Sequence, residues 1–114
     1  MHQDTIQKAA ADMSNAENYA TEANGKCSHA EGLISIANGM ASHAEGGGTI
    51  ASGKYQHVQG KYNVEDADNK YAHILGGGSD ANNRKNIHTV DWDGNAEYRG
   101  DVTVHYGDST IPIG

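Results

Sequence analysis

Histidine and carboxylate side chains recur together in the middle of the chain and are its clearest candidates for chemistry. An imidazole beside a carboxylate can carry protons, form an ion pair or bind a metal ion. A serine stands just before each of the first two pairs, which adds the residue types of a nucleophilic site. The repeated polar positions are His29, Glu31, His43, Glu45, His57 and Gln59.

The repetition of this group argues against catalysis. A nucleophile needs a singular, strained and desolvated setting, whereas the run Ser-His-Ala-Glu begins at Ser28 and again at Ser42. A run that recurs is structural by default. We therefore expect no catalytic residue, no cofactor and no enzyme activity.

A metal site within one chain is not expected either. Zinc sites on helices use histidines one helical turn apart and zinc fingers use paired cysteines, but here the histidines fall one per repeat. Three copies of His29, His43 or His57 on a threefold axis are the arrangement that could still hold an ion. The run Asp91-Trp92-Asp93-Gly94-Asn95 resembles the start of a calcium loop, yet Val102 stands where the closing glutamate belongs. We interpret this run as a hairpin turn.

The pairs belong to a sequence repeat of constant period. The period equals the separation between Gly25 and Gly39, and we call each copy of the repeat a rung. GKCSHAEGLISIAN, GMASHAEGGGTIAS and GKYQHVQGKYNVED follow one another at that offset from Gly25. Each rung holds two short alternating segments closed by glycine, which predicts two strands, two turns and a solenoid. Glycine supplies the positive φ or the close backbone approach that a tight corner requires. The corner glycines are Gly25, Gly39 and Gly53 in one column and Gly32, Gly46 and Gly60 in another.

The composition predicts that one copy of the chain can bury little apolar surface. Its 114 residues include two Leu, eight Ile, five Val, no Phe and 15 Gly, and its net charge is −7. Ordering the backbone costs roughly 1–2 kcal/mol per residue. Two arrangements can bury the apolar surface: rungs that stack on one another, and several chains that share one core. We expect both.

Charge and cysteine content narrow the classes of partner. Only eight Lys and Arg are scattered along the chain, so nucleic acid is not an expected partner. Cys27 is the only cysteine and cannot form an intrachain disulfide. No run approaches the ~18–20 apolar residues of a membrane span, and the N-terminus does not read as a signal peptide.

Residues 1–24 admit two interpretations. When the segment is aligned with the repeat that begins at Gly25, one period further along the chain, the two match imperfectly. The segment can therefore be a degenerate rung. We expect a short helix to about Ser14 and a degenerate rung from about Asn18. The helix is favoured by apolar residues at the a/d spacing of a coiled coil, namely Ile6, Ala9, Met13, Ala16, Ala20 and Ala23.

The rungs are expected to occupy residues 25–78. A drifted fourth copy contains His73, which follows His57 at a slightly longer interval than the regular period, and the run of glycines from Gly76 then breaks the pattern. The roll therefore ends near this point.

Residues 79–114 are expected to form a cap or connector. Residues 87–92 and 96–99 read as the strands of a β-hairpin whose turn contains Asp93 and Gly94, and residues 102–106 read as a further strand. Trp92 and Tyr98 lie on opposite sides of this turn. We expect them to pack the hairpin, with a surface platform for saccharide as the alternative.

The sequence motifs of the repeats resemble those of known fibrous proteins. The SxAxG and xxAxG alternation is similar to the head repeats of trimeric autotransporter adhesins. The SHAEG and TxASG repeats, followed by QHVQGKYN, AHILGGG and HTVDWDGNAEYRGDV, resemble tail-fibre or tail-appendage proteins of phages and prophages in Gram-positive bacteria. The resemblance covers about residues 25–104.

This resemblance implies an all-β fold, a trimeric left-handed parallel β-roll. To it the residues add a short N-terminal helix and a C-terminal β-hairpin cap. The implied role is a structural and host-adhesion component of a tail fibre, located in the virion, with a host cell-surface glycan or protein as receptor. The alternative location is the cell surface, as the head of a bacterial adhesin. A self-processing fibre domain is the alternative of another class.

The polar pairs depart from the adhesin pattern, which has apolar residues at those positions. If the columns face inward, stacked carboxylates would repel one another and would have to pair with histidines, across the trimer. If they face outward, they form a solvated stripe. Both orientations stay open at this point.

Overall fold

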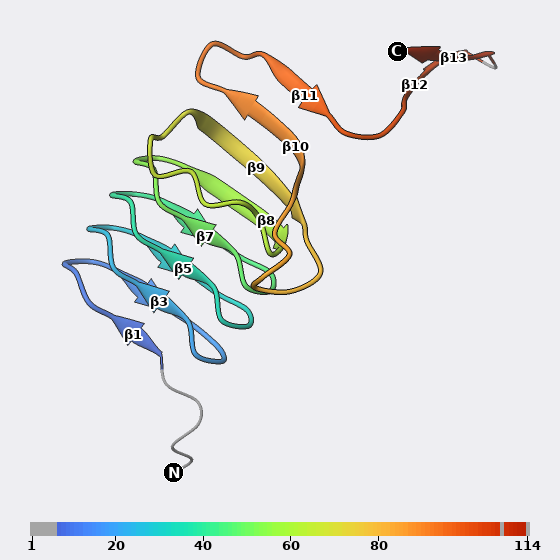
Figure 1. The fold of residues 1–114 in the computed structure, drawn as a ribbon. Coiled ribbons are helices and arrows are strands. Elements are labelled where there is room, and N and C mark those ends of the chain that lie inside the picture. The colour runs from blue at the N-terminus through green and yellow to red at the C-terminus, as the bar shows by residue number, and fades with distance from the viewer. Residues whose placement is uncertain (1–6, 108, 114) are drawn as a thin grey trace.

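The computed structural model of the chain describes residues 7–107 and 109–113. Within them the chain winds into a parallel β-solenoid of about five turns, and every regular element is a strand. The molecule measures 54 × 29 × 28 Å along its principal axes, with the solenoid toward the N-terminal end and two hairpins after it (Figure 1). None of the described residues belongs to a helix long and apolar enough to cross a membrane.

The turns of the solenoid build two sheets. Most turns add one short strand to each sheet, and the Cα partners in neighbouring turns keep the period of the sequence, as in His29 with His43 and Ile36 with Ile50. Equivalent side chains of successive rungs therefore stack in columns. The four-stranded sheet has the order β1 (Lys8–Ala9), β3 (Glu22–Ala23), β5 (Ile36–Ala37) and β7 (Ile50–Ala51).

The seven-stranded sheet continues beyond the solenoid. Its strands in spatial order are β11 (Ala96–Tyr98), β10 (Asn86–Asp91), β9 (Tyr71–Gly77), β8 (His57–Lys61), β6 (His43–Ala44), β4 (His29–Ala30) and β2 (Asn15–Ala16). The pairs from β2 to β9 are parallel, whereas β9–β10 and β10–β11 are antiparallel. The hairpin expected from the sequence is thus joined edge to edge to the last turns of the solenoid.

The core is a column of small side chains between the two sheets. From β3 to β7, alternation along each strand buries the alanine and leaves its preceding neighbour partly exposed. Hydroxyl side chains of the adjoining position are buried as well; Ser42 Oγ donates to the carbonyl oxygen of Gly39 at 2.7 Å, whereas the equivalent Ser28 Oγ has no hydrogen-bond partner. The fully buried apolar residues are Ala23, Ala30, Ala37, Ala44, Ala51, Val58 and Ile74.

The two glycine columns serve two different corner geometries. Gly32 and Gly46 both have a φ of 102°, and a Cβ on either would also overlap the carbonyl oxygen of the next glycine in the column. Gly25 and Gly39 lack a positive φ, but a Cβ there would overlap the backbone of the next rung. One column is therefore required by conformation and proximity, the other by proximity alone.

A third corner column was not identified from the sequence, because it contains no glycine. Its first four residues adopt left-handed conformations with φ between 55° and 63° and point their side chains into solvent. They are Met13, Cys27, Ala41 and Tyr55.

The first described turn corrects the expectation for the N-terminal segment. Strand β1 and a turn occupy residues 8–13, where a helix to about Ser14 was expected, and Lys8 pairs in register with Glu22. The degenerate rung therefore begins well before Asn18. Stacking on the next turn satisfies the backbone of this segment and overrides its helix propensity. Residues 1–6 lie outside the described residues.

The C-terminal end contains one expected strand and one that was missed. Strand β12 (Val102–Tyr106) matches the expected range, and it forms a second antiparallel hairpin with β13 (Ser109–Ile113). In Figure 1 this hairpin stands away from the solenoid at the end of a connecting segment.

Candidate functional site

The polar pairs lie on the outer surface of the seven-stranded sheet. In each of β4 and β6 the alanine points into the core, so the histidine before it and the glutamate after it point outward. Between 29% and 43% of each of these histidine and glutamate side chains is exposed. We call this set the imidazole–carboxylate ladder; it comprises His29, Glu31, His43, Glu45 and His57.

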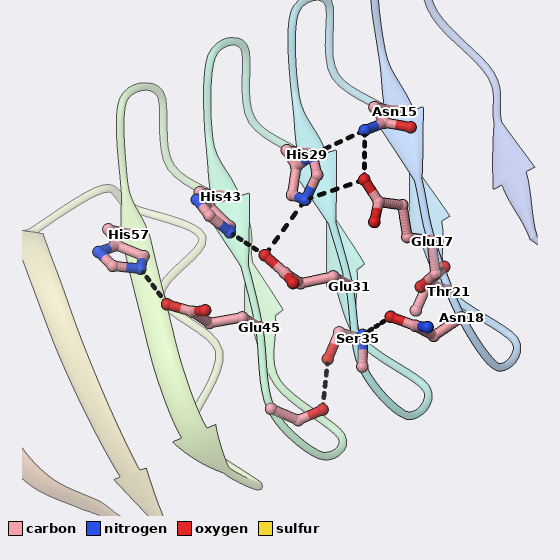
Figure 2. Close-up of polar contacts among 12 residues, drawn as sticks. Asn15, Glu17, Asn18, Thr21, His29, Glu31, Ser35, His43, Glu45 and His57 are labelled. Carbon is pink, nitrogen blue, oxygen red and sulfur yellow. Dashed lines mark hydrogen bonds and ion pairs between the residues drawn. The ribbon is translucent and has the colours of Figure 1, made fainter.

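Each glutamate of the ladder pairs with a histidine of the following rung. Nε2 of His43 lies 3.1 Å from Oε1 of Glu31, and Nε2 of His57 lies 2.8 Å from Oε1 of Glu45. The same Oε1 of Glu31 is also 3.2 Å from Nε2 of His29 (Figure 2). The carboxylates are therefore paired with histidines of their own chain, and their pairing requires no contact across a trimer.

The ladder extends one rung further toward the N-terminus than the sequence repeat suggested. Asn15 takes the place of the histidine, and its Nδ2 contacts Glu17 Oε1 at 2.8 Å and His29 Nδ1 at 3.1 Å. Glu17 Oε1 lies 3.9 Å from Nε2 of His29. The degenerate rung thus preserves the polar column although it replaces the imidazole with an amide.

The imidazole rings also lie next to one another in a row that runs along the sheet to the hairpin. The ring centroids of His29, His43, His57, His73 and His88 follow one another at 4.7, 4.9, 5.7 and 5.4 Å. Burial lowers the pKa of His73, and the neighbouring His57 and His88 lower it further. His73 was visible in the sequence as part of the drifted fourth copy; His88 joins from an antiparallel strand, which no repeat pattern could have revealed.

Adjacent rungs bring metal-ligating atoms close together, contrary to the argument from sequence spacing. Each of two groups supplies two imidazole nitrogens and one carboxylate oxygen, all within 4.8 Å of one another. The groups are His29, Glu31 and His43, and His43, Glu45 and His57. One histidine per rung becomes a cluster because the rungs are stacked at the spacing of neighbouring strands. Gln59, which follows His57, ends the carboxylate column.

The expected aromatic pair does not form the interior of the hairpin. Trp92 is 49% exposed and donates from Nε1 to the carbonyl oxygen of Asn69 at 2.9 Å, which ties the turn to the preceding loop. Tyr98 is 57% exposed and stacks on the ring of His88, with centroids 4.3 Å apart.

The hairpin turn is organised by Asp91. Its Oδ1 accepts hydrogen bonds of 2.9 Å from the backbone N–H groups of Asp93 and Asn95, while Gly94 has a φ of 87°. The side-chain hydrogen bond from Asn95 is the main cause of the lowered pKa of Asp91, with backbone donors adding to it. The carboxylate thus accepts hydrogen bonds from within the turn. This supports the interpretation of the run as a hairpin turn rather than a calcium loop.

A hollow of about 450 Å³ lies beside the hairpin. Its lining includes His88, Glu97, Tyr98 and Arg99, so it offers an aromatic ring together with charged groups of both signs. The hollow therefore adjoins Tyr98, one of the exposed aromatic residues of the cap.

No protein-family model matches the chain, and no curated protein or solved structure matches it either. The fibre resemblance therefore rests on the residues of the repeat and on the solenoid that they form.

Proposed function

We propose that the chain is a structural and host-adhesion component of a phage or prophage tail fibre. In this proposal three copies associate as a left-handed parallel β-roll trimer that forms a stiff shaft segment with a capped end. The sequence motifs of the repeat support membership of the fibre family. The stacked turns supply the stiffness, because backbone groups of each turn form hydrogen bonds to the turns on either side.

The observation that carries this proposal is an apolar surface along one side of the solenoid. Ile36 and Ile50 alternate with buried alanines and so face outward, where they are only half-buried. Val64 stands one period after Ile50 and is 46% exposed, while Leu33 and Ile34, at the corner before β5, are 48% and 46% exposed. A chain whose own core is mostly alanine gains most from covering this surface with copies of itself.

Host adhesion is assigned to the cap. Trp92 and Tyr98 present large exposed rings, Tyr98 beside the hollow, and aromatic rings with polar neighbours suit a cell-surface glycan or protein. Labelled protein should be retained by cells of a Gram-positive host, and a Trp92→Ala/Tyr98→Ala variant should be retained less. An absence of retention across a panel of such cells would contradict the adhesive part of the proposal.

The assembly is tested by light scattering on a sizing column, at neutral pH and without a tag. We expect a mass near three times 12.0 kDa. An Ile36→Lys/Ile50→Lys variant should be monomeric or unfolded, whereas Asn82→Lys adds the same kind of charge on an exposed loop and should keep the parent mass. A monomeric parent would overturn the trimer and with it most of the support for a fibre.

Two alternatives have separate tests. The head of a bacterial surface adhesin would be favoured by a secretion signal or membrane anchor encoded in the same gene. A self-processing fibre domain would be revealed by mass spectrometry of the purified chain as a specific internal break.

A further inference from the structure

We propose that the imidazole–carboxylate ladder binds one divalent transition-metal ion per chain, of the class of Zn²⁺ or Ni²⁺. This binding site goes beyond the fibre role and does not depend on it, because every ligand comes from a single chain. The ligands would be His43 together with either His29 and Glu31 or His57 and Glu45 (Figure 2).

The first group already approximates an open coordination site. Oε1 of Glu31 lies between Nε2 of His29 at 3.2 Å and Nε2 of His43 at 3.1 Å, distances close to those between ligands that share one small cation. A modest opening of the three side chains would admit an ion. Since 29–39% of each side chain is exposed, water can reach the metal and complete its coordination.

The second group repeats this arrangement one rung later. Nε2 of His57 is 2.8 Å from Oε1 of Glu45, and the rings of His43 and His57 are 4.9 Å apart. His43 belongs to both groups, and a neutral imidazole has one nitrogen with a free lone pair, so it can serve only one ion at a time. The two groups are therefore alternative positions, which fixes the expected stoichiometry at one ion per chain.

The choice of metal follows from the ligand types. Two imidazoles with one carboxylate suit Zn²⁺, Ni²⁺ or Cu²⁺, whereas Ca²⁺ and Mg²⁺ require sites built of oxygen. Coordination through Nε2 places the proton of a neutral imidazole on Nδ1. For His29 that nitrogen is 3.1 Å from the exposed carboxamide of Asn15, which can rotate to offer its oxygen as acceptor.

The backbone preorganises the ligands. His29 N–H bonds to the carbonyl oxygen of Ser42 at 2.9 Å, and His43 N–H bonds to that of Gln56 at 2.9 Å. The columns are thus held in register by the same hydrogen bonds that form the sheet, and binding orders only side chains.

The sequence contains an internal comparison for this site. Gln59 replaces the carboxylate between His57 and His73, whose rings are 5.7 Å apart. That position has two imidazoles but no anionic ligand. It is not part of the proposed site, and removing His73 should leave the affinity unchanged.

The test is calorimetric titration of untagged, EDTA-treated protein with Ni²⁺ and with Zn²⁺ at neutral pH. We expect saturation at one ion per chain and a melting temperature that rises with the metal, since an ion bound to the folded form stabilises it. His43→Asn should weaken binding by about tenfold or more, because it breaks both groups. His29→Asn and His57→Asn should each weaken it less, because each leaves one group intact. His105→Asn, on β12, is the control and should bind as the parent does.

A second variant distinguishes loss of metal binding from loss of folding. Glu31→Gln/Glu45→Gln keeps every imidazole and nearly the same side-chain volume, and it should melt near the parent temperature while losing metal affinity. The visible absorption of bound Co²⁺ gives a direct signal of nitrogen and oxygen coordination. Equal affinity in the parent and His43→Asn, absence of saturable binding, or equal tightness for Ca²⁺ would each overturn the proposal.

Discussion

The side-chain amide of Asn63 pairs with both backbone polar groups of Ile50. Ile50 N–H donates to Oδ1 at 2.8 Å, and Nδ2 donates to the carbonyl oxygen of Ile50 at 3.0 Å. Strand β7, to which Ile50 belongs, is the last strand of the four-stranded sheet. The amide thus takes the place of the peptide group that a further rung would supply, and it closes a sheet edge that would otherwise be open to pairing.

Replacing Asn63 should destabilise the solenoid. Asn63 is fully buried, so Asn63→Ala would leave the backbone N–H and C=O of Ile50 without these partners. We expect a loss of about 2–4 kcal/mol in the free energy of unfolding, measured by urea denaturation. Asn82→Ala on the exposed loop is the control and should change little. Equal stability of the two variants would show that Asn63 does not close the edge.

Substitutions at glycine should separate crowding from backbone conformation. Gly46 and Gly94 both have positive φ, of 102° and 87°, but only at Gly46 would a Cβ overlap the neighbouring backbone. Gly94→Ala should therefore cost about 1–2 kcal/mol from its φ alone. Gly46→Ala should cost clearly more, and Gly46→Val should abolish the parent assembly. Thermal melting compares the three variants, and similar costs for the two alanine substitutions would contradict the close packing of rungs.

Acidification should weaken the fold through His73. Its pKa in the folded chain is below the ordinary value of 6.5, chiefly through burial. As the pH falls below 6.5, the unfolded chain binds a proton that the folded chain resists, so stability declines until the folded pKa is reached. In the presence of EDTA, His73→Gln should lose less melting temperature than the parent between neutral pH and pH values below this range. Parallel curves for parent and variant would contradict the prediction.

The carboxylates of the ladder should contribute little to stability. Glu45 pairs with His57 at 2.8 Å, but both side chains are more than a third exposed, at 35% and 43%. Such pairs are screened by water and salt. Glu45→Gln should change the free energy of unfolding by less than about 1 kcal/mol. A loss as large as that of Asn63→Ala would mean that the ladder holds the rungs together.

The period of the fold could be predicted from the sequence because the same residue types return at the same positions over several turns. Alanine stands at the inward position of the short strands, and glycine stands where a Cβ would meet the next rung. These constraints are local to a rung and its neighbour, so they are visible as columns in the sequence. The N-terminal strand was harder to recognise, because Lys8 and Ala9 fit a helix until a neighbouring rung is present to pair with them.

The rest depends on where the repetition ends. The role of Asn63 arises only because β7 lacks a following strand, and the position of His88 beside His73 depends on the antiparallel return of β10. The proximity of the ladder ligands was missed for a related reason. The ligands of one group are widely separated along the chain, whereas residues in adjacent rungs are neighbours at the distance between strands.

The corner glycines also bear on how such a chain can change over evolutionary time. Because each rung contacts its neighbours through the same backbone geometry, a duplication or deletion of the gene segment that encodes one whole rung would preserve both junctions. Length would then vary in whole-rung steps without redesign of the core, while an insertion of any other size would displace alanine and glycine from their columns. Gene variants of this protein should accordingly differ by complete rungs, with Asn63 and the hairpin kept at the end.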